Sequence, residues 1–168
     1  MIPILRLVHI ISGVFWVGSI LFVTVLLMPS IRAAGPSGMA IMKELGRRRM
    51  PLIMMVSGIL TVGAGIWLML VLSGGAVGVW MRSSTGRAFG TGGGLAILAL
   101  VLGMSINVPT TQRMSAIGAA VAKRGGPPTA DEASELQRLQ SRLGIASVVV
   151  AVLLLLATAA MAVARYLR

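Results

Sequence analysis

The one histidine of the chain, His9, lies within a long apolar stretch near the N-terminus. An ionisable ring at membrane depth is costly to bury, and for that reason it indicates a functional site by default. The sequence holds no cysteine and no second histidine. If the chain binds a metal or a tetrapyrrole through a strong nitrogen or sulfur ligand of its own, His9 is therefore the only candidate.

Helical spacing places four residues around His9. Gly13, Trp16 and Ile20 share its face of a helix, and the small Ser12 lies beside it. A glycine one turn from the histidine leaves a slot in which a flat macrocycle could approach the helix backbone, with Trp16 at the macrocycle edge. The alternative interpretation is that His9 donates a hydrogen bond to a carbonyl or to Ser12 and binds no ligand. Spacing alone does not choose between the two.

The composition indicates which class of protein must position these residues. Hydrophobic residues make up 57% of the chain and charged residues 11%, and the mean hydropathy is +0.94. These values are incompatible with an ordinary soluble domain, so we expect an all-α polytopic membrane protein. Four uncharged stretches each reach the roughly 20 residues that a helix needs to cross about 30 Å of hydrocarbon. The predicted transmembrane helices are 3–31, 51–73, 88–112 and 143–166, packed as a four-helix bundle in a single domain, 1–168.

Lysine and arginine are unevenly divided between the two ends of this bundle, with ten on the side of the first and third loops and five on the opposite side. Because these residues are retained preferentially in the cytoplasm, we expect both termini and His9 near the outer face of a bacterial cytoplasmic (inner) membrane. The net charge of +11 flanks apolar spans, which favours membrane contact over nucleic-acid binding. The ten are Arg32, Lys43, Arg47, Arg48, Arg49, Arg113, Lys123, Arg124, Arg138 and Arg142, and the five are Arg6, Arg82, Arg87, Arg165 and Arg168.

Two connections carry signals for the start of a helix. Thr129 and Glu132 have the spacing of a capping box, in which the hydroxyl and the carboxylate satisfy amide donors at a helix start. The last helix should therefore begin near residue 130 and project beyond the membrane on the loop side. In the first loop, Gly35 and the Pro-Ser pair after it can start a short helix that ends at Gly46.

Three arginines, Arg47, Arg48 and Arg49, follow this short helix directly. A basic cluster near the bilayer favours contact with anionic lipid headgroups or with acidic groups on a neighbouring subunit. We therefore expect membrane lipids as partners, together with other membrane subunits or a second copy of the chain.

Glycines and one polar run punctuate the predicted helices. Small residues at helical spacing let helices approach closely in lipid. The polar run from Asn107 to Gln112 contains Pro109, and it indicates a helix exit or a kink. The glycines at such spacing are Gly58, Gly63 and Gly65 in the second helix and Gly86, Gly90 and Gly94 in the third.

Methionine offers a second kind of metal ligand, because thioethers suit Cu(I). The chain has 12 methionines, and Met50 and Met54 place two sulfur atoms on one face of the second helix. Methionine is also an ordinary packing residue in apolar segments, and packing is the favoured interpretation. A copper-binding role remains as an alternative.

The first predicted helix resembles a known family. His9, then Trp16-Val-Gly18, then an apolar run ending in Pro29 and Arg32 is similar to the first helix of the copper-resistance D family and its bacterial four-helix relatives. More distantly, it resembles the membrane protoporphyrinogen oxidase of the HemJ type, whose first helix carries a haem-associated histidine before a tryptophan-containing run. The resemblance covers the first two helices. It implies a four-helix bundle with haem b or a metal near the outer end of the first helix, held by His9.

Three functions follow as expectations. The first is a non-catalytic membrane subunit of a larger respiratory or photosynthetic complex that holds one tetrapyrrole through His9, beside Ser12, Gly13 and Trp16. The others are a stand-alone haem b redox protein and a copper-handling membrane protein. The interiors of the second, third and fourth helices contain no histidine, lysine or carboxylate. Because a redox enzyme needs groups that move protons, the sequence favours a protein that is not an enzyme.

Overall fold

The computed structural model describes residues 2–167, and of residues 36, 37, 39 and 43 it describes the backbone only. Four helices in this range are long and apolar enough to cross a membrane, which confirms the predicted all-α four-helix bundle. By length and composition, the chain is a multi-pass membrane protein whose apolar helices suit contact with lipid. The four spans are Ile2–Ala33, Met50–Leu72, Ser84–Arg124 and Ala130–Tyr166.

The first span is connected to the second span through a short helix. The first span is built from α1 (Ile2–Leu21), a π-helical segment (Phe22–Leu27) and α2 (Met28–Ala33). A short helix, α3 (Pro36–Arg47), follows and agrees with the predicted loop helix to within one residue. The second span is α4 (Met50–Leu72).

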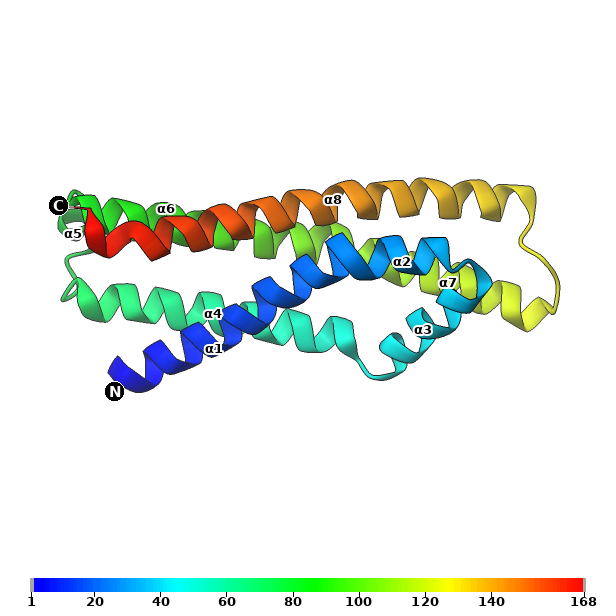
Figure 1. Cartoon of the computed structure of the whole chain (residues 1–168), viewed down its shortest axis with the longest axis horizontal. Coiled ribbons are helices and arrows are strands. Elements are labelled where there is room, and N and C mark those ends of the chain that lie inside the picture. Colours follow the sequence, from blue (N-terminus) through cyan, green and yellow to red (C-terminus); the bar gives the residue numbers. More distant parts are fainter. Residues whose placement is uncertain (1, 168) are drawn as a thin grey trace.

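The second half of the chain forms a long hairpin. A short α5 (Val77–Trp80) leads into α6 (Ser84–Leu102), a π-helical segment (Gly103–Asn107) and α7 (Val108–Arg124), which together make the third span. The fourth span is α8 (Ala130–Val163), closed by a single 3₁₀ turn (Ala164–Tyr166). Both described ends of the chain lie at one end of the bundle, and α3 and the α7–α8 turn lie at the other (Figure 1).

The bundle is built from two helix pairs, α1 with α4 and α6 with α8. Figure 1 shows the C-terminal part of α8 running alongside α6 and its N-terminal part alongside α7. This second pair is in close contact at Gly92, where a Cβ atom would lie 2.9 Å from the carbonyl oxygen of Ala157. A core of Trp16, Ala96, Ala99, Val150, Leu154 and Ala157 joins the two pairs.

Two spans pass through a π-helical segment just before a proline. The segment Phe22–Leu27 precedes Pro29, and Gly103–Asn107 precedes Pro109. Proline lacks an amide donor, and its ring clashes with the carbonyl four residues earlier, so a wider turn relieves the clash without ending the helix. The third helix therefore continues beyond residue 112, the predicted end of its transmembrane part, to Arg124.

The ends of the helices follow their local sequence. Thr129 Oγ1 accepts a hydrogen bond from the Glu132 amide at 3.2 Å, and Glu132 Oε2 accepts one from the Thr129 amide at 2.8 Å. This capping box confirms that α8 begins at Ala130. Gly125, with φ 71°, ends α7 in the left-handed conformation that glycine adopts without strain.

Candidate functional site

His9 lies in α1 with its ring against α4. The Nδ1 atom is 2.8 Å from the main-chain carbonyl oxygen of Thr61. Because a carbonyl oxygen can only accept a hydrogen bond, Nδ1 must be the donor and must carry a proton. In the neutral ring, Nε2 then carries no proton and has a lone pair that can bind a metal. No hydrogen bond to Nε2 is found among residues 2–167.

The ring reaches this carbonyl because residue 65 has no side chain. A Cβ atom on Gly65 would lie 2.9 Å from Cε1 and 3.1 Å from Nδ1 of His9. Gly65 is one helical turn after Thr61, in the direction in which the Thr61 carbonyl points along α4. The glycine therefore makes the space that the imidazole fills.

The other residues predicted to surround His9 also face α4. The Thr61 hydroxyl lies 2.9 Å from Ser12 Oγ and 2.7 Å from the carbonyl oxygen of Ser57. Its single proton can be given to only one of these two acceptors at a time. Ser12 Oγ in turn donates to the Val8 carbonyl oxygen at 2.6 Å.

Gly13 and Trp16 complete this contact. A Cβ atom on Gly13 would lie 3.3 Å from Thr61 Cγ2, so the space beside Gly13 is filled by α4. Trp16 is only 4% exposed. A Cβ atom on Gly58 would lie 2.8 Å from its Cε2 atom, which places the indole directly against the α4 backbone. Of the predicted cofactor-binding group, His9 alone offers a ring nitrogen with a lone pair for a metal, because the indole nitrogen of Trp16 can only donate a hydrogen bond.

We call this contact the α1–α4 seam. Thr61, 7% exposed, lies at its centre and is not among the site residues predicted from the sequence. Gly58, Thr61 and Gly65 are spaced three and four residues apart, so they share one face of α4. A polar residue between two glycines at this spacing is the signal that could have found it. The seam comprises His9, Ser12, Gly13, Trp16, Gly58, Thr61 and Gly65.

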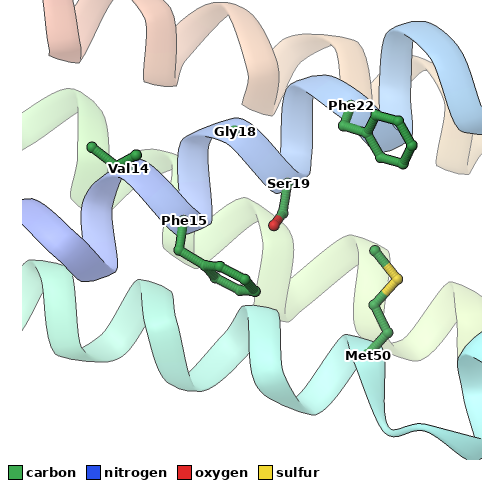
Figure 2. Close-up of a pocket in the computed structure, with 6 residues that line it drawn as sticks. All are labelled: Val14, Phe15, Gly18, Ser19, Phe22 and Met50. Carbon is green, nitrogen blue, oxygen red and sulfur yellow. The ribbon is translucent and has the colours of Figure 1, made fainter.

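The methionines of the copper alternative lie elsewhere. Met50 lines an open pocket of about 310 Å³ between the first span and the start of α4. Figure 2 shows its side chain opposite Ser19 and Phe22. Met54 follows one turn later and is half-buried. The described residues contain no group of three or more histidine, cysteine, aspartate or glutamate side chains that could hold a metal ion. The pocket is lined by Val14, Phe15, Gly18, Ser19, Phe22 and Met50.

The arginine cluster after α3 is partly neutralised within the chain. Glu44 accepts hydrogen bonds from Arg47 at 2.7 and 2.8 Å and from Arg48 at 2.8 Å. The Arg47 guanidinium, followed by that of Arg48, holds the pKa of the Glu44 carboxyl below its usual value. Arg49 adopts a positive φ of 55° at the start of α4, and no ion pair to it is found among the described side chains. Two sequence-predicted basic side chains, those of Lys43 and Arg168, lie outside the described residues.

Comparison of the chain with protein-family models, with curated proteins and with solved structures finds no match.

Proposed function

We propose that the chain is a non-catalytic membrane subunit of a larger respiratory or photosynthetic complex, and that it holds one tetrapyrrole, such as haem b, through Nε2 of His9. The hydrogen bond from Nδ1 of His9 to the Thr61 carbonyl carries this proposal. A histidine that ligates a metal almost always donates its other ring N–H to a carbonyl, a carboxylate or water, because this bond selects the tautomer and orients the ring.

The surroundings of His9 fit such a ligand. Gly65 admits the imidazole against α4, and the half-buried ring is tied to both α1 and α4. The two helices are also held together on the turns of α1 that follow His9, by Ser12, Gly13 and Trp16. When bound, a haem would supply one-electron transfer, and the chain's own contribution would be to orient the Nε2 atom of His9 and to raise its basicity.

The proposed orientation places the two ends of the bundle on different sides of a bacterial cytoplasmic (inner) membrane. The end with α3 and the α7–α8 turn carries ten of the fifteen lysines and arginines of the sequence. By the preference of these residues for the cytoplasmic side, this end is cytoplasmic and both termini face away from the cytoplasm. His9, seven residues after Ile2 at the start of α1, then lies close to the outer surface.

A larger assembly is supported by the length of the second hairpin. The 34 residues of α8 extend over about 50 Å, compared with about 30 Å of hydrocarbon. The first three turns of α8 are polar and are joined to α7 by the ion pairs Arg113–Glu135 at 2.7 Å and Arg124–Glu132 at 2.6 Å. This ordered projection gives a neighbouring subunit a rigid surface outside the membrane.

Gentle purification from native membranes tests both parts of the proposal. We expect the chain to migrate in mild detergent with other subunits, at a mass well above that of its monomer or dimer. Organic extraction of that complex should release a tetrapyrrole. The amount of tetrapyrrole per chain should fall when His9→Ala protein is incorporated. A pigmented homodimer would instead support the stand-alone haem protein.

Copper bound to the purified protein and lost in a Met50→Leu, Met54→Leu double variant would support the copper alternative. Protein without pigment at native stoichiometry would contradict the tetrapyrrole proposal, and the mass of the complex would still test the subunit role separately.

A further inference from the structure

A second open pocket lies between the third span and α8, and none of its lining residues belongs to the α1–α4 seam. Its volume is about 400 Å³. Five of its six lining residues are apolar and the sixth is an arginine. An apolar surface with a single cation at its edge matches the two chemical parts of a charged lipid. The lining residues are Leu102, Ile106, Arg142, Ile145, Ala146 and Val149.

The order of these residues along α8 corresponds to depth in a membrane. Arg142 is the last charged residue before the uncharged run 143–164, so it lies at the boundary of the hydrocarbon. Ile145 and Val149 follow it by three and seven residues on the same face of the helix. The guanidinium therefore stands at headgroup level, and the apolar part of the pocket continues towards the bilayer centre.

Arg142 is exposed like the paired arginines nearby, but unlike them it makes no hydrogen bond or ion pair with the described residues. The nearest acidic residue on its face of α8, Glu135, is already held by Arg113 through two hydrogen bonds of 2.7 and 3.2 Å. Arg138, also exposed, lies one turn before Arg142 on the same face. Arg142 thus has no counter-charge among the described residues, and Arg138, whose charge also acts on Glu135, lies beside it above the apolar pocket.

We infer that this pocket binds one anionic glycerophospholipid of the membrane leaflet on the α3 side. An acyl chain lies along Ile106, Ile145 and Val149, and the phosphate contacts Arg142 with Arg138 beside it. Charge-assisted contacts between arginine and phosphate are among the stronger hydrogen bonds in proteins. Basic residues at headgroup level add to the attraction of anionic lipid.

A second copy of the chain is a poorer occupant on grounds of charge. The sequence has only four acidic residues, and three of them, Glu44, Glu132 and Glu135, are engaged in ion pairs. Another copy would therefore bring mainly arginines to Arg142 and Arg138. A lipid with phosphate as its only charge brings the opposite sign, and it also fills an apolar surface that water solvates poorly.

Native mass spectrometry of the full chain tests this inference. The protein, delipidated in detergent, is titrated with dioleoyl phosphatidylglycerol or with dioleoyl phosphatidylcholine. We expect one tightly retained phosphatidylglycerol per chain and weaker retention of phosphatidylcholine. Arg142→Gln should lower the affinity for phosphatidylglycerol about fivefold to tenfold, and Arg142→Lys should restore part of it. Ala146→Phe, which fills the pocket, should weaken binding of both lipids.

Arg32→Gln is the matched control. Arg32 is exposed at the same level of the bundle, since its Nη2 atom lies 3.4 Å from the position of a Cβ on Gly144, but it does not line the pocket. Its removal should leave the retained lipid unchanged. The inference would be overturned if the two lipids were retained equally, or if Arg32→Gln and Arg142→Gln lost equal affinity for phosphatidylglycerol. A protein dimer that displaces the lipid would also overturn it.

Discussion

His9 reaches the carbonyl of Thr61 only because residue 65 is a glycine, so the candidate ligand depends on a residue with no side chain of its own. The imidazole of His9 and the Cβ of an alanine at position 65 would compete for the same space. At the residue scale, the α1–α4 seam is therefore a set of close contacts in which each glycine leaves space for one larger side chain from the other helix.

Replacing Gly65 with alanine should displace the His9 ring and break its hydrogen bond to Thr61. The new Cβ would lie 2.9 Å from Cε1. We expect a loss of about 1 kcal/mol in the free energy of unfolding, which is typical of one hydrogen bond. Unfolding in mixed detergent micelles would measure it. Gly63→Ala is the control, because no atom lies within 4 Å of a Cβ at Gly63; equal losses in both variants would argue against the described contact.

Gly58→Ala should disturb the core more strongly. Its Cβ would lie 2.8 Å from Cε2 of Trp16 and 3.1 Å from Cδ1 of Leu100, and the buried indole has little room to move. Overpacking of this kind costs about 1–3 kcal/mol. The loss is measured by the same unfolding method, together with a shift in tryptophan fluorescence. In Gly18→Ala, on an open part of α1, neither quantity should change; an unperturbed Gly58→Ala protein would contradict the packing of Trp16.

Much of α1's face could be predicted from the sequence, but its partner could not. Helical spacing alone places His9, Ser12, Gly13 and Trp16 close together on α1. The hydrogen-bond acceptor is a main-chain carbonyl, which leaves no trace in residue type. Spacing also misjudged which glycines pack closely: Gly63 and Gly94 have no atom within 4 Å of a Cβ, whereas Gly92 lies against α8. Whether a glycine packs closely depends on which helices become neighbours and on how each helix is rotated about its axis.

At the scale of elements, local signals located helix starts well but did not reveal how far the third helix continues. The capping box at Thr129 is a short-range pattern, and it marked the start of α8 correctly. Pro109 predicts a helix exit or a kink, and in the structure a π-helical segment precedes it and the helix continues to Arg124. Continuation past a proline depends on tertiary packing, here against α8, which sequence pattern does not reveal.

The projecting α7–α8 hairpin should depend on Glu132. This residue is both half of the capping box and the partner of Arg124, at 2.6 Å. Glu132→Gln removes the ion pair, so we expect faster tryptic cleavage after Lys123 and Arg138. Asp131→Asn serves as the control, because Asp131 takes no part in the α8 capping box or in either α7–α8 ion pair. Unchanged cleavage in Glu132→Gln would show that the ion pair does not hold the hairpin.

Acid should loosen the same hairpin. The Arg124 hydrogen bonds, followed by that from the Thr129 amide, lower the pKa of Glu132 from 4.5 to about 2. Residues 130–142 precede the apolar run, so this carboxylate lies outside the membrane-spanning segment. A lowered folded-state pKa contributes stability above the unfolded pKa, and that stability is lost as the pH falls towards 2. Hydrogen exchange, corrected for intrinsic rates, should show falling protection at 124–138 between pH 5 and pH 2.5, with the seam unaffected; protection constant across this range would contradict the assignment.

At the scale of the whole molecule, composition predicts the class of fold but not which helices pack as pairs. Long apolar stretches separated by charges predicted four spans in one bundle. The arrangement as two pairs, α1 with α4 and α6 with α8, arises from specific contacts: Thr61 and glycines in one pair, and Gly92 against Ala157 in the other. The two pairs meet around Trp16 and Ala99. The proposed tetrapyrrole and the proposed lipid thus belong to different pairs and can be tested independently.

The most direct test of the central proposal is the absorption spectrum, oxidised and reduced, of gently purified protein beside a His9→Ala variant. The proposal predicts tetrapyrrole bands in the parent protein that vanish in His9→Ala, while circular dichroism shows the helices intact. Added imidazole should restore part of the bands by replacing the missing ring. Bands that persist unchanged in His9→Ala, or no bands in either protein, would contradict the assignment of His9 as a ligand.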